Sequence, residues 1–343
     1  MTEAVGASLP RVIDGLQFAN WSRKVFEQMR AGGVCAVHVT VAYHEDFRGT
    51  VALLETWNER FIQHGDLIGF AGNRAEMDAV IDSGRTAILF GLQNPSPIEA
   101  DIGLVEVIHR LGIRFMQLSY NNQSLLCGGW TEAVDSGVTN MGREVIREMN
   151  RLGMLIDMSH SAEKSTLEAI ELSERPIVVS HANPSWWMPT KRNKSDTVLR
   201  ELAHSGGLVG LSLYPVHLPD GSKTKLESFC RMTMRLAETI GVEHIGLGTD
   251  LCQEQPGSVL SWMRNGLWRR ETSVERQRLE FPDAVSWFSS NLDFANVRRG
   301  LLEVGFAEVD VERIMWRNWY EFLSAALEPH CALQTRGNLK VRA

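Results

Sequence analysis

MLIDMSH at residues 154–160 and PIVVSH at residues 176–181 are the two stretches that decide the fold of this chain. Each begins as an apolar run and ends in a Ser-His pair, and helical patterns flank both runs. The pattern predicts two buried strands, each followed directly by a histidine, His160 or His181. In an α/β barrel the C-terminal ends of the strands meet at one rim, which carries the chemistry of such barrels. Two histidines on neighbouring strands at that rim could share one metal ion.

A rhythm of strands and helices extends from these two stretches over most of the chain. Apolar runs predict six further strands, at residues 12–16, 34–42, 87–92, 114–119, 208–213 and 244–249. Helical patterns lie between the strands, at residues 20–30, 46–83, 102–111, 141–151 and 226–240, and from near Ser195. Eight strands that alternate with helices predict a TIM-like (β/α)8 barrel. A doubly wound open sheet would produce a similar rhythm and is the alternative.

We expect the whole chain, residues 1–343, to form this single barrel domain. Its length suits one large α/β barrel or two smaller domains, and no linker, repeat or low-complexity segment divides it. Residues 258–296 are richer in Arg, Glu and Trp than the rest of the chain. This shift in composition predicts a long insertion or lid around residues 255–296.

Composition limits the kinds of partner that the chain can have. The formal net charge of -7 argues against general binding of nucleic acids, which requires a basic surface. No run of 18 apolar residues predicts a membrane-spanning helix, and the first residues do not resemble a signal peptide. The 5 cysteines are scattered without a CxxC pair, which suits free thiols in a reducing compartment. We therefore expect a cytoplasmic protein that acts on a small molecule, without a membrane or nucleic acid as partner.

Polar side chains follow the predicted strands at the expected rim. They are Gln93, Tyr120, His160, His181 and Asp250. Two imidazoles and one carboxylate on separate strands would suit an open zinc site, and zinc lowers the pKa of its bound water to about 7. Asp250 could accept the proton of that water, complete the coordination, or only cap the following helix. Asn121 begins a polar run suited either to holding a substrate or to forming a loop that satisfies its own backbone.

Several motifs, taken in their order along the chain, resemble the membrane dipeptidase (renal dipeptidase) family of zinc peptidases, in its bacterial branch. They are IDMSH at residues 156–160, VSH at 179–181, Arg192-Asn193 before a helix, and IGLGTD at 245–250. The resemblance covers roughly residues 12–323. It implies a barrel of the metal-dependent hydrolase type, a two-zinc site, and removal of one residue from a dipeptide.

The sequence departs from this family at several positions that hold metal in the family. The family's His-x-Asp after the first strand corresponds to Leu16 and Phe18, and its bridging Glu corresponds to Gln93. The family's substrate-contacting His after the fourth strand corresponds to Tyr120. The remaining pair, His160 and His181, would bind at most one zinc ion tightly. A protein without metal is the alternative.

The resemblance also implies a role for Arg192, which would hold a carboxylate of the substrate with its planar guanidinium. Without the resemblance, Arg192 could equally be a surface arginine near a helix start. With Asp250 as the catalytic residue and Gln93, Tyr120 and Asn121 beside the substrate, we predict a hydrolase that cleaves a dipeptide or similar small amide with a free carboxylate. The alternatives are a non-catalytic ligand-binding barrel and a lyase-type enzyme, each descended from a dipeptidase. The oligomeric state is open, with a homodimer as one option.

Overall fold

The fold is a closed barrel of parallel strands, as the sequence predicted. The computed structural model describes residues 11–272, 275 and 279–327. The barrel strands are β1 (Val12–Gln17), β2 (Val34–Ala42), β4 (Thr86–Leu92), β5 (Ile113–Gln117), β6 (Leu155–Asp157), β7 (Val178–Val179), β8 (Leu208–Leu211) and β9 (Ile245–Leu247). The pairings of β2 with β4 and of β1 with β9 close the ring. The open doubly wound sheet is therefore excluded.

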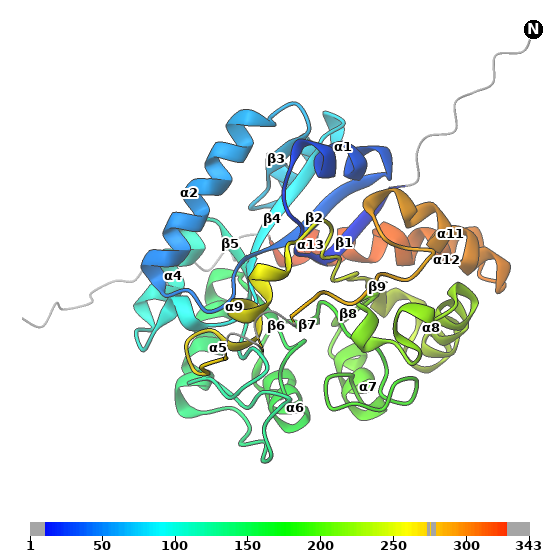
Figure 1. Ribbon diagram of the computed structural model, residues 1–343. Coiled ribbons are helices and arrows are strands. Elements are labelled where there is room, and N and C mark those ends of the chain that lie inside the picture. Colours follow the sequence, from blue (N-terminus) through cyan, green and yellow to red (C-terminus); the bar gives the residue numbers. More distant parts are fainter. Residues whose placement is uncertain (1–10, 273–274, 276–278, 328–343) are drawn as a thin grey trace, which may run out of the picture.

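Helices surround the ring of strands (Figure 1). They are α1 (Arg23–Ala31), α2 (Phe47–Gln63), α3 (Arg74–Asp82), α4 (Gly103–Arg110), α5 (Asn140–Leu152), α6 (Glu163–Leu172), α7 (Asp196–His204), α8 (Leu226–Ile240), α9 (Leu260–Asn265), α11 (Phe294–Glu303), α12 (Glu308–Glu312) and α13 (Asn318–Ala326). A Ser, Thr, Asp or Asn side chain accepts a backbone N–H at the start of α1, α2, α3, α5 and α7. These caps fix the points at which the chain leaves a loop and enters a helix.

The prediction of one helical region over residues 46–83 is wrong. This segment forms α2, then the short strand β3 (Ile68–Phe70), then α3. The helix stops at His64, and Gly65 follows it; glycine is a poor helix former. Asn73 then begins α3, because its side chain accepts the N–H of Glu76 at 2.9 Å. β3 pairs with the first half of β4 and widens the sheet beside the ring.

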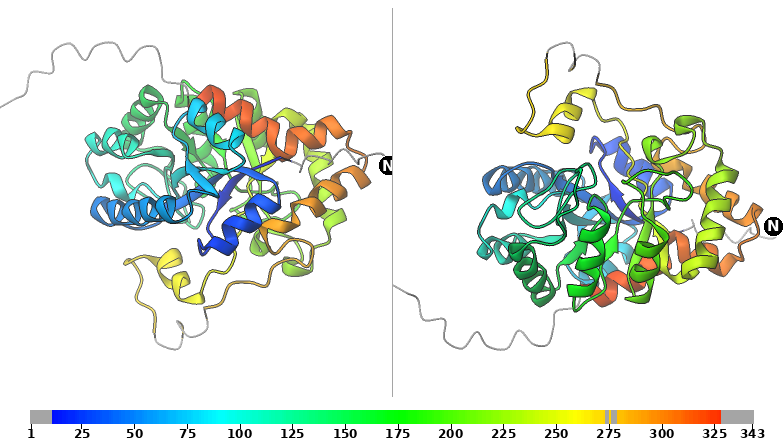
Figure 2. Two further views of the ribbon diagram at one scale, coloured as in Figure 1. Left: turned by 90° about the horizontal axis from the view of Figure 1, so that it is seen from above. Right: turned by 90° about the horizontal axis from the view of Figure 1, so that it is seen from below.

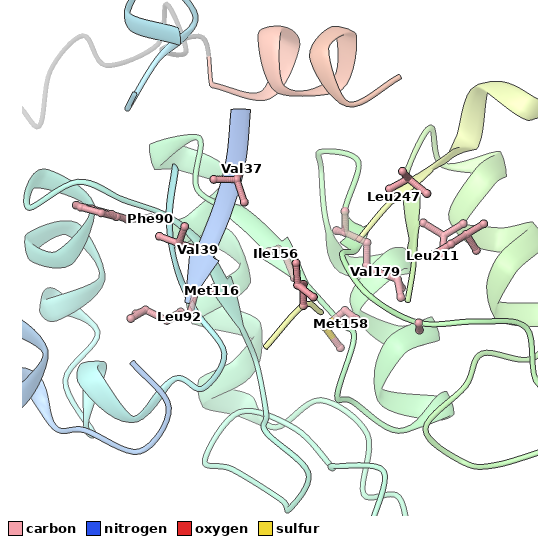
Figure 3. Packing of buried hydrophobic residues seen from close by; sticks show 14 of the residues in the cluster. Val37, Val39, Phe90, Leu92, Met116, Ile156, Met158, Val179, Leu211 and Leu247 are labelled. Atoms are coloured by element: carbon pink, nitrogen blue, oxygen red, sulfur yellow. The ribbon is translucent and has the colours of Figure 1, made fainter. Parts of the chain in front are cut away.

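One hydrophobic core fills the space between the strands and the surrounding helices (Figure 3). Residues two apart on one strand point to the same face, so Val37 and Val39 of β2 and Phe90 and Leu92 of β4 all contribute to this core. The strands are buried on both faces, which explains why they read as continuous apolar runs in the sequence. This packing makes the barrel a rigid support for the loops at its C-terminal rim.

The opposite end of the barrel is closed by the indole of Trp319 on α13. Its Nε1 donates to the carbonyl of Leu247 at 2.7 Å. A Cβ added at Gly15 would lie 2.3 Å from the Trp319 ring, and one at Gly246 would lie 2.4 Å from it. Only glycine therefore lets the indole approach β1 and β9 this closely. The side chain of Asn318 donates to the carbonyls of Val242 and Ile245 and ties α13 to the start of β9.

The segment after β9 departs from the regular strand-helix alternation. It contains α9, which stands off from the ring of helices in both views of Figure 2 (yellow). Two contacts attach α9 to the loop after β2: the Trp262 indole donates to Glu45 at 2.6 Å, and the Met263 carbonyl lies 3.2 Å from His44 Nε2. Among the described residues, no helix is both long and apolar enough to cross a membrane.

Candidate active site

A cavity of about 600 Å³ lies at the C-terminal ends of the barrel strands. Its walls include Gln93, Tyr120, Asn121, His160, Arg192 and Asp250. These are six of the seven residues that the sequence proposed for the site, and they come from five different loops. The seventh, His181, lies directly behind His160. The barrel thus brings together residues that are up to 157 positions apart in the sequence.

The two histidines meet through their outer ring nitrogens. His160 Nε2 lies 2.9 Å from His181 Nε2. Asn121 Oδ1 accepts the indole N–H of Trp130 at 2.7 Å and also lies 2.7 Å from His160 Nδ1. Because Oδ1 is an acceptor, the proton of this second bond belongs to His160 Nδ1, and His160 Nε2 carries a lone pair. Asn121 adopts a left-handed backbone (φ 60°), which asparagine tolerates better than most residues.

The carboxylate of Asp157 holds the loops of both histidines. It accepts the backbone N–H of Ser159 and of Ser180, each at 3.0 Å, and both serine hydroxyls at 2.5 Å. The Ser180 oxygen therefore gives its proton to Asp157 and accepts one from His181 Nδ1, which lies 2.7 Å away. The Nε2 atoms of His160 and His181 are thus held so that their lone pairs face a common point.

Two buried basic side chains, Arg192 and Lys194, lie beside this histidine pair. Arg192 Nη1 donates to the Ser159 carbonyl at 2.7 Å, and Nη2 donates to the His181 carbonyl at 2.9 Å and lies 3.2 Å from His160 Nε2. Lys194 Nζ donates to the carbonyls of Met158 and Ser161. Burial lowers the pKa of Arg192 to about 10, and burial together with Arg192 lowers the pKa of Lys194 to about 7. Arg192 is 3% exposed, so it is not the surface arginine that the sequence left as an alternative.

One donor of Arg192 is unused. Its Nε–H is buried and has no hydrogen-bond partner within the described part of the chain. Buried donors almost always have a partner, so an orphan beside a cavity points to a group that enters from outside. An acceptor oxygen of a bound molecule would meet this requirement.

Asp250 contributes the carboxylate of the cavity. Burial raises its pKa to about 7, against the lowering effect of Arg192, and Asp14 raises it further. Among the residues described, no donor hydrogen-bonds to this carboxylate, and the next helical turn, Gly257–Val259, begins several residues later. The alternative that Asp250 caps a helix is therefore wrong. Its backbone is left-handed (φ 56°), a strained conformation for aspartate of the kind found at functional sites.

Sequence reasoning missed several residues of the cavity wall: Tyr43, Tyr214, Cys252 and Arg264. Tyr43 immediately follows β2, so the rule that selected His160 and Asp250 would also have selected it. Its hydroxyl accepts the amide N–H of Gln93 at 3.1 Å, and its ring lies 5.1 Å from that of Tyr120. Burial raises the pKa of Cys252 well above its usual value, so its thiol stays protonated. Arg264 lies on α9, and no sequence motif around it indicated a role in the site.

The fold and this site place the chain in the class of (β/α)8 barrels with a polar cavity at the C-terminal ends of the strands. The sequence profile of the membrane dipeptidase family, peptidase family M19, matches residues 19–260. The chain therefore belongs to the membrane dipeptidase family, as the motifs around His160, His181 and Asp250 had indicated.

Relatives of this chain include dipeptidases and solved barrel structures. Dipeptidase tcpJ of Claviceps purpurea is 25% identical over 279 residues, which are 80% of this chain and 59% of tcpJ. Dipeptidase verJ of Clonostachys rogersoniana is 27% identical over 215 residues, 62% of this chain and 55% of verJ. The chain thus spans little more than half the length of these curated relatives.

Structural similarity extends over nearly the whole chain. An amidohydrolase from Pseudomonas aeruginosa is 33% identical, with a TM-score of 0.86 over 93% of this chain and 97% of that one. A metallo peptidase from Rhodobacter sphaeroides, liganded with a phosphinate mimic of the dipeptide L-Ala-D-Ala, is 18% identical, with a TM-score of 0.76 over 91% of this chain and 98% of that one. The second likeness shows a shared fold.

Membership in the family implies a metal ion, typically zinc. The described residues contain no group of three or more His, Cys, Asp or Glu side chains that could hold a metal ion. Catalytic zinc usually takes three protein ligands, and here only the His160 and His181 Nε2 atoms face a common point. The guanidinium of Arg192 also lies against His160 Nε2, and a cation there disfavours a dication beside it. The donor set therefore does not by itself fit a tightly held catalytic zinc.

Three positions, Leu16, Phe18 and Gln93, were matched to family ligands from the sequence, and the structure shows what these side chains contact. Leu16 is completely buried. The Phe18 ring packs edge-on against Tyr43, with ring centroids 4.9 Å apart. The amide of Gln93 donates to Thr40 at 2.7 Å as well as to Tyr43. Asp14 is likewise engaged, because it accepts both the N–H and the hydroxyl of Thr249.

Proposed function

We propose that this protein is a hydrolase that cleaves a dipeptide or similar small amide with a free carboxylate. The observation that supports this most directly is the pair formed by Arg192 and Asp250 in one cavity. Arg192 is buried with an unused Nε–H donor, and Asp250 presents a carboxylate to which nothing in the described chain donates. A substrate with a carboxylate and a scissile amide offers a complement to each.

In this proposal Arg192 binds the carboxylate of the substrate. Its other donors already hold the carbonyls of Ser159 and His181, so the guanidinium has little freedom to move. A fixed guanidinium orients the substrate without a further loss of side-chain entropy. Gln93, Tyr120 and Asn121 line the same cavity, and we propose that they contact the rest of the substrate.

Asp250 acts as the general base and then as the general acid. Its carboxylate accepts a proton from a water molecule while the water oxygen forms a bond to the amide carbon. The carbon–nitrogen bond then breaks, and Asp250 returns the proton to the departing amine nitrogen. The products are a carboxylic acid and an amine. A pKa of about 7 suits both roles near neutral pH.

We propose that the site holds at most one metal ion and that His160 and His181 would be its ligands. Their Nδ1 protons are bound by Asn121 and by the Ser180–Asp157 pair, an arrangement that directs both Nε2 lone pairs inward. A zinc ion there would polarise a substrate carbonyl or lower the pKa of a water molecule. Because the third protein ligand is absent from the described residues, we assign no step of the reaction to this ion.

We also propose a role for the segment after β9, because it lies beside the cavity. Met263, Arg264, Asn265 and Trp268 lie in or just after α9 and form one wall of the cavity. We propose that this segment acts as a lid over the substrate within a single barrel domain. The cytoplasmic location and the homodimer considered from the sequence stay predictions.

The test is a panel of dipeptides and N-acyl amino acids, each assayed as the free acid and as the carboxamide. The wild type should hydrolyse a free acid and lose most of this activity on the matching carboxamide. Absence of hydrolysis of every small amide, with calorimetric binding of the same compounds retained, would instead support the non-catalytic ligand-binding barrel.

A further inference from the structure

The cavity is positively charged inside an acidic protein. Among the described residues that line it, Asp250 is the only acidic one, whereas Arg192 lies in its wall near the histidines and Arg264 enters it from α9. Because the pKa of Asp250 is raised to about 7, its negative charge is incomplete at neutral pH. The cavity therefore carries a positive excess, while the whole chain has a formal net charge of -7. A charged cleft of this kind attracts ligands of the opposite sign.

Arg264 is held in the wall of the cavity by the packing of its own helix. Leu260 and Met263 of α9 are buried in a small hydrophobic cluster with Tyr43 and Tyr120. The indole of Trp262 donates a hydrogen bond to Glu45. The side chain of Arg264, half-buried between these anchored residues, thus faces the cavity from a fixed position.

No carboxylate of the protein pairs with Arg264 in the described part of the chain. Arg269, five residues later on the same segment, forms an ion pair with Glu275 at 2.9 Å. Burial raises the pKa of the Tyr214 hydroxyl, and the nearby guanidinium of Arg264 opposes this rise. A half-buried guanidinium that lines a cavity without a counter-ion is suited to bind an anion from solution.

We propose that the substrate carries a second carboxylate and that Arg264 binds it. This inference rests on the proposed function, in which Arg192 binds the first carboxylate. The substrate class would then be a dipeptide, or an N-acyl amino acid, with an acidic side chain. A dianionic ligand of this kind matches the two arginines.

The test compares two uncleavable dipeptide analogues in which CH2 replaces the peptide carbonyl, one ending in glutamate and the other in glutamine. These residues are nearly isosteric and differ in one charge. Calorimetry on the wild type should show tighter binding of the glutamate analogue by about tenfold, the scale of one partly exposed charge-assisted contact. Arg264→Gln should remove this preference, whereas Arg264→Lys should keep part of it.

Arg269→Gln is the matched control, because it removes an exposed arginine from the same segment. It should leave the preference for glutamate as in the wild type. Circular dichroism and thermal unfolding of each variant establish that the barrel is intact. Equal binding of both analogues to the wild type, or a preference that survives in Arg264→Gln, would overturn the proposal.

A glutamate preference in kcat/KM on the cleavable dipeptides is a second readout. Binding that discriminates between the analogues without any hydrolysis would contradict the proposed function but support the role of Arg264. Hydrolysis at the same kcat/KM with and without the second charge would support the proposed function but contradict the role of Arg264. The two proposals therefore fail in different experiments.

Discussion

Replacement of Asp250 by Asn should make this protein more stable while it removes activity. The native fold holds Asp250 where burial raises its pKa from 3.8 to about 7. Folding therefore favours the protonated form, and ionisation of Asp250 destabilises the native state. Asparagine has nearly the same shape as the protonated acid, does not ionise, and tolerates the left-handed backbone at this position.

The magnitude follows from the shift in pKa. One pKa unit corresponds to about 1.4 kcal/mol, so a rise from 3.8 to about 7 corresponds to at most about 4 kcal/mol. Asp250 is partly exposed to the cavity, and water there screens its charge, so we expect roughly half of this value. Since the folded pKa is raised, the protonated form stabilises the wild type at low pH, and this stability is lost as the pH rises through about 7.

The assay is urea unfolding of the wild type and Asp250→Asn at about pH 4 and about pH 8. At about pH 8 the variant should be more stable by about 2 kcal/mol, and near pH 4 the two proteins should be nearly equal. The kcat of the variant should fall by about 10²–10⁴-fold, and wild-type kcat/KM should rise with pH through about 7, because only the carboxylate accepts a proton. A variant that is equally or less stable at about pH 8 would refute this account of the Asp250 environment.

Arg192→Lys keeps the charge but loses the planar guanidinium, so it should lower kcat/KM for free acids. The loss of kcat/KM on going from the free acid to the carboxamide should be much smaller in this variant than in the wild type. Metal analysis after extensive dialysis should find at most one zinc per chain, and any zinc that is retained should be lost in His160→Gln. Two retained equivalents would contradict the assignment. Trp319→Ala should destabilise the barrel by about 3–5 kcal/mol in urea unfolding, because it empties the floor of the barrel. The exposed Trp268 is the control, and its replacement by Ala should leave the stability nearly unchanged.

The barrel could be predicted because its strands are short, buried and regularly spaced. The runs before His160 and His181 became β6 and β7, and each histidine took the place at the rim that a strand end dictates. The one large error, a helix over residues 46–83, arose because Ile68–Phe70 is too short to give a periodic signal. A three-residue strand between two helices is recognisable only through its partner, β4.

Part of the site was predictable because several of its residues directly follow predicted strands. Asp250, His160 and His181 stand at strand ends, where position alone suggests a role. The burial of Arg192, its unused Nε–H and its contact with His160 depend on two loops that meet in space, those after β6 and β7, and no local pattern encodes them. Arg264 lies on a segment without any recognisable motif, so only the cavity revealed it.

The indole of Trp319 has a consequence for how the barrel is made. A residue more than 300 positions after Gly15 seals the space between β1 and β9. The contact between Trp319 and β1 can therefore form only after nearly the whole chain has left the ribosome. Contacts so distant in sequence slow folding and leave partly formed sheets exposed in the meantime. Nascent chains that lack α13 should be protease-sensitive, and the appearance of α13 should mark the point at which the barrel becomes resistant.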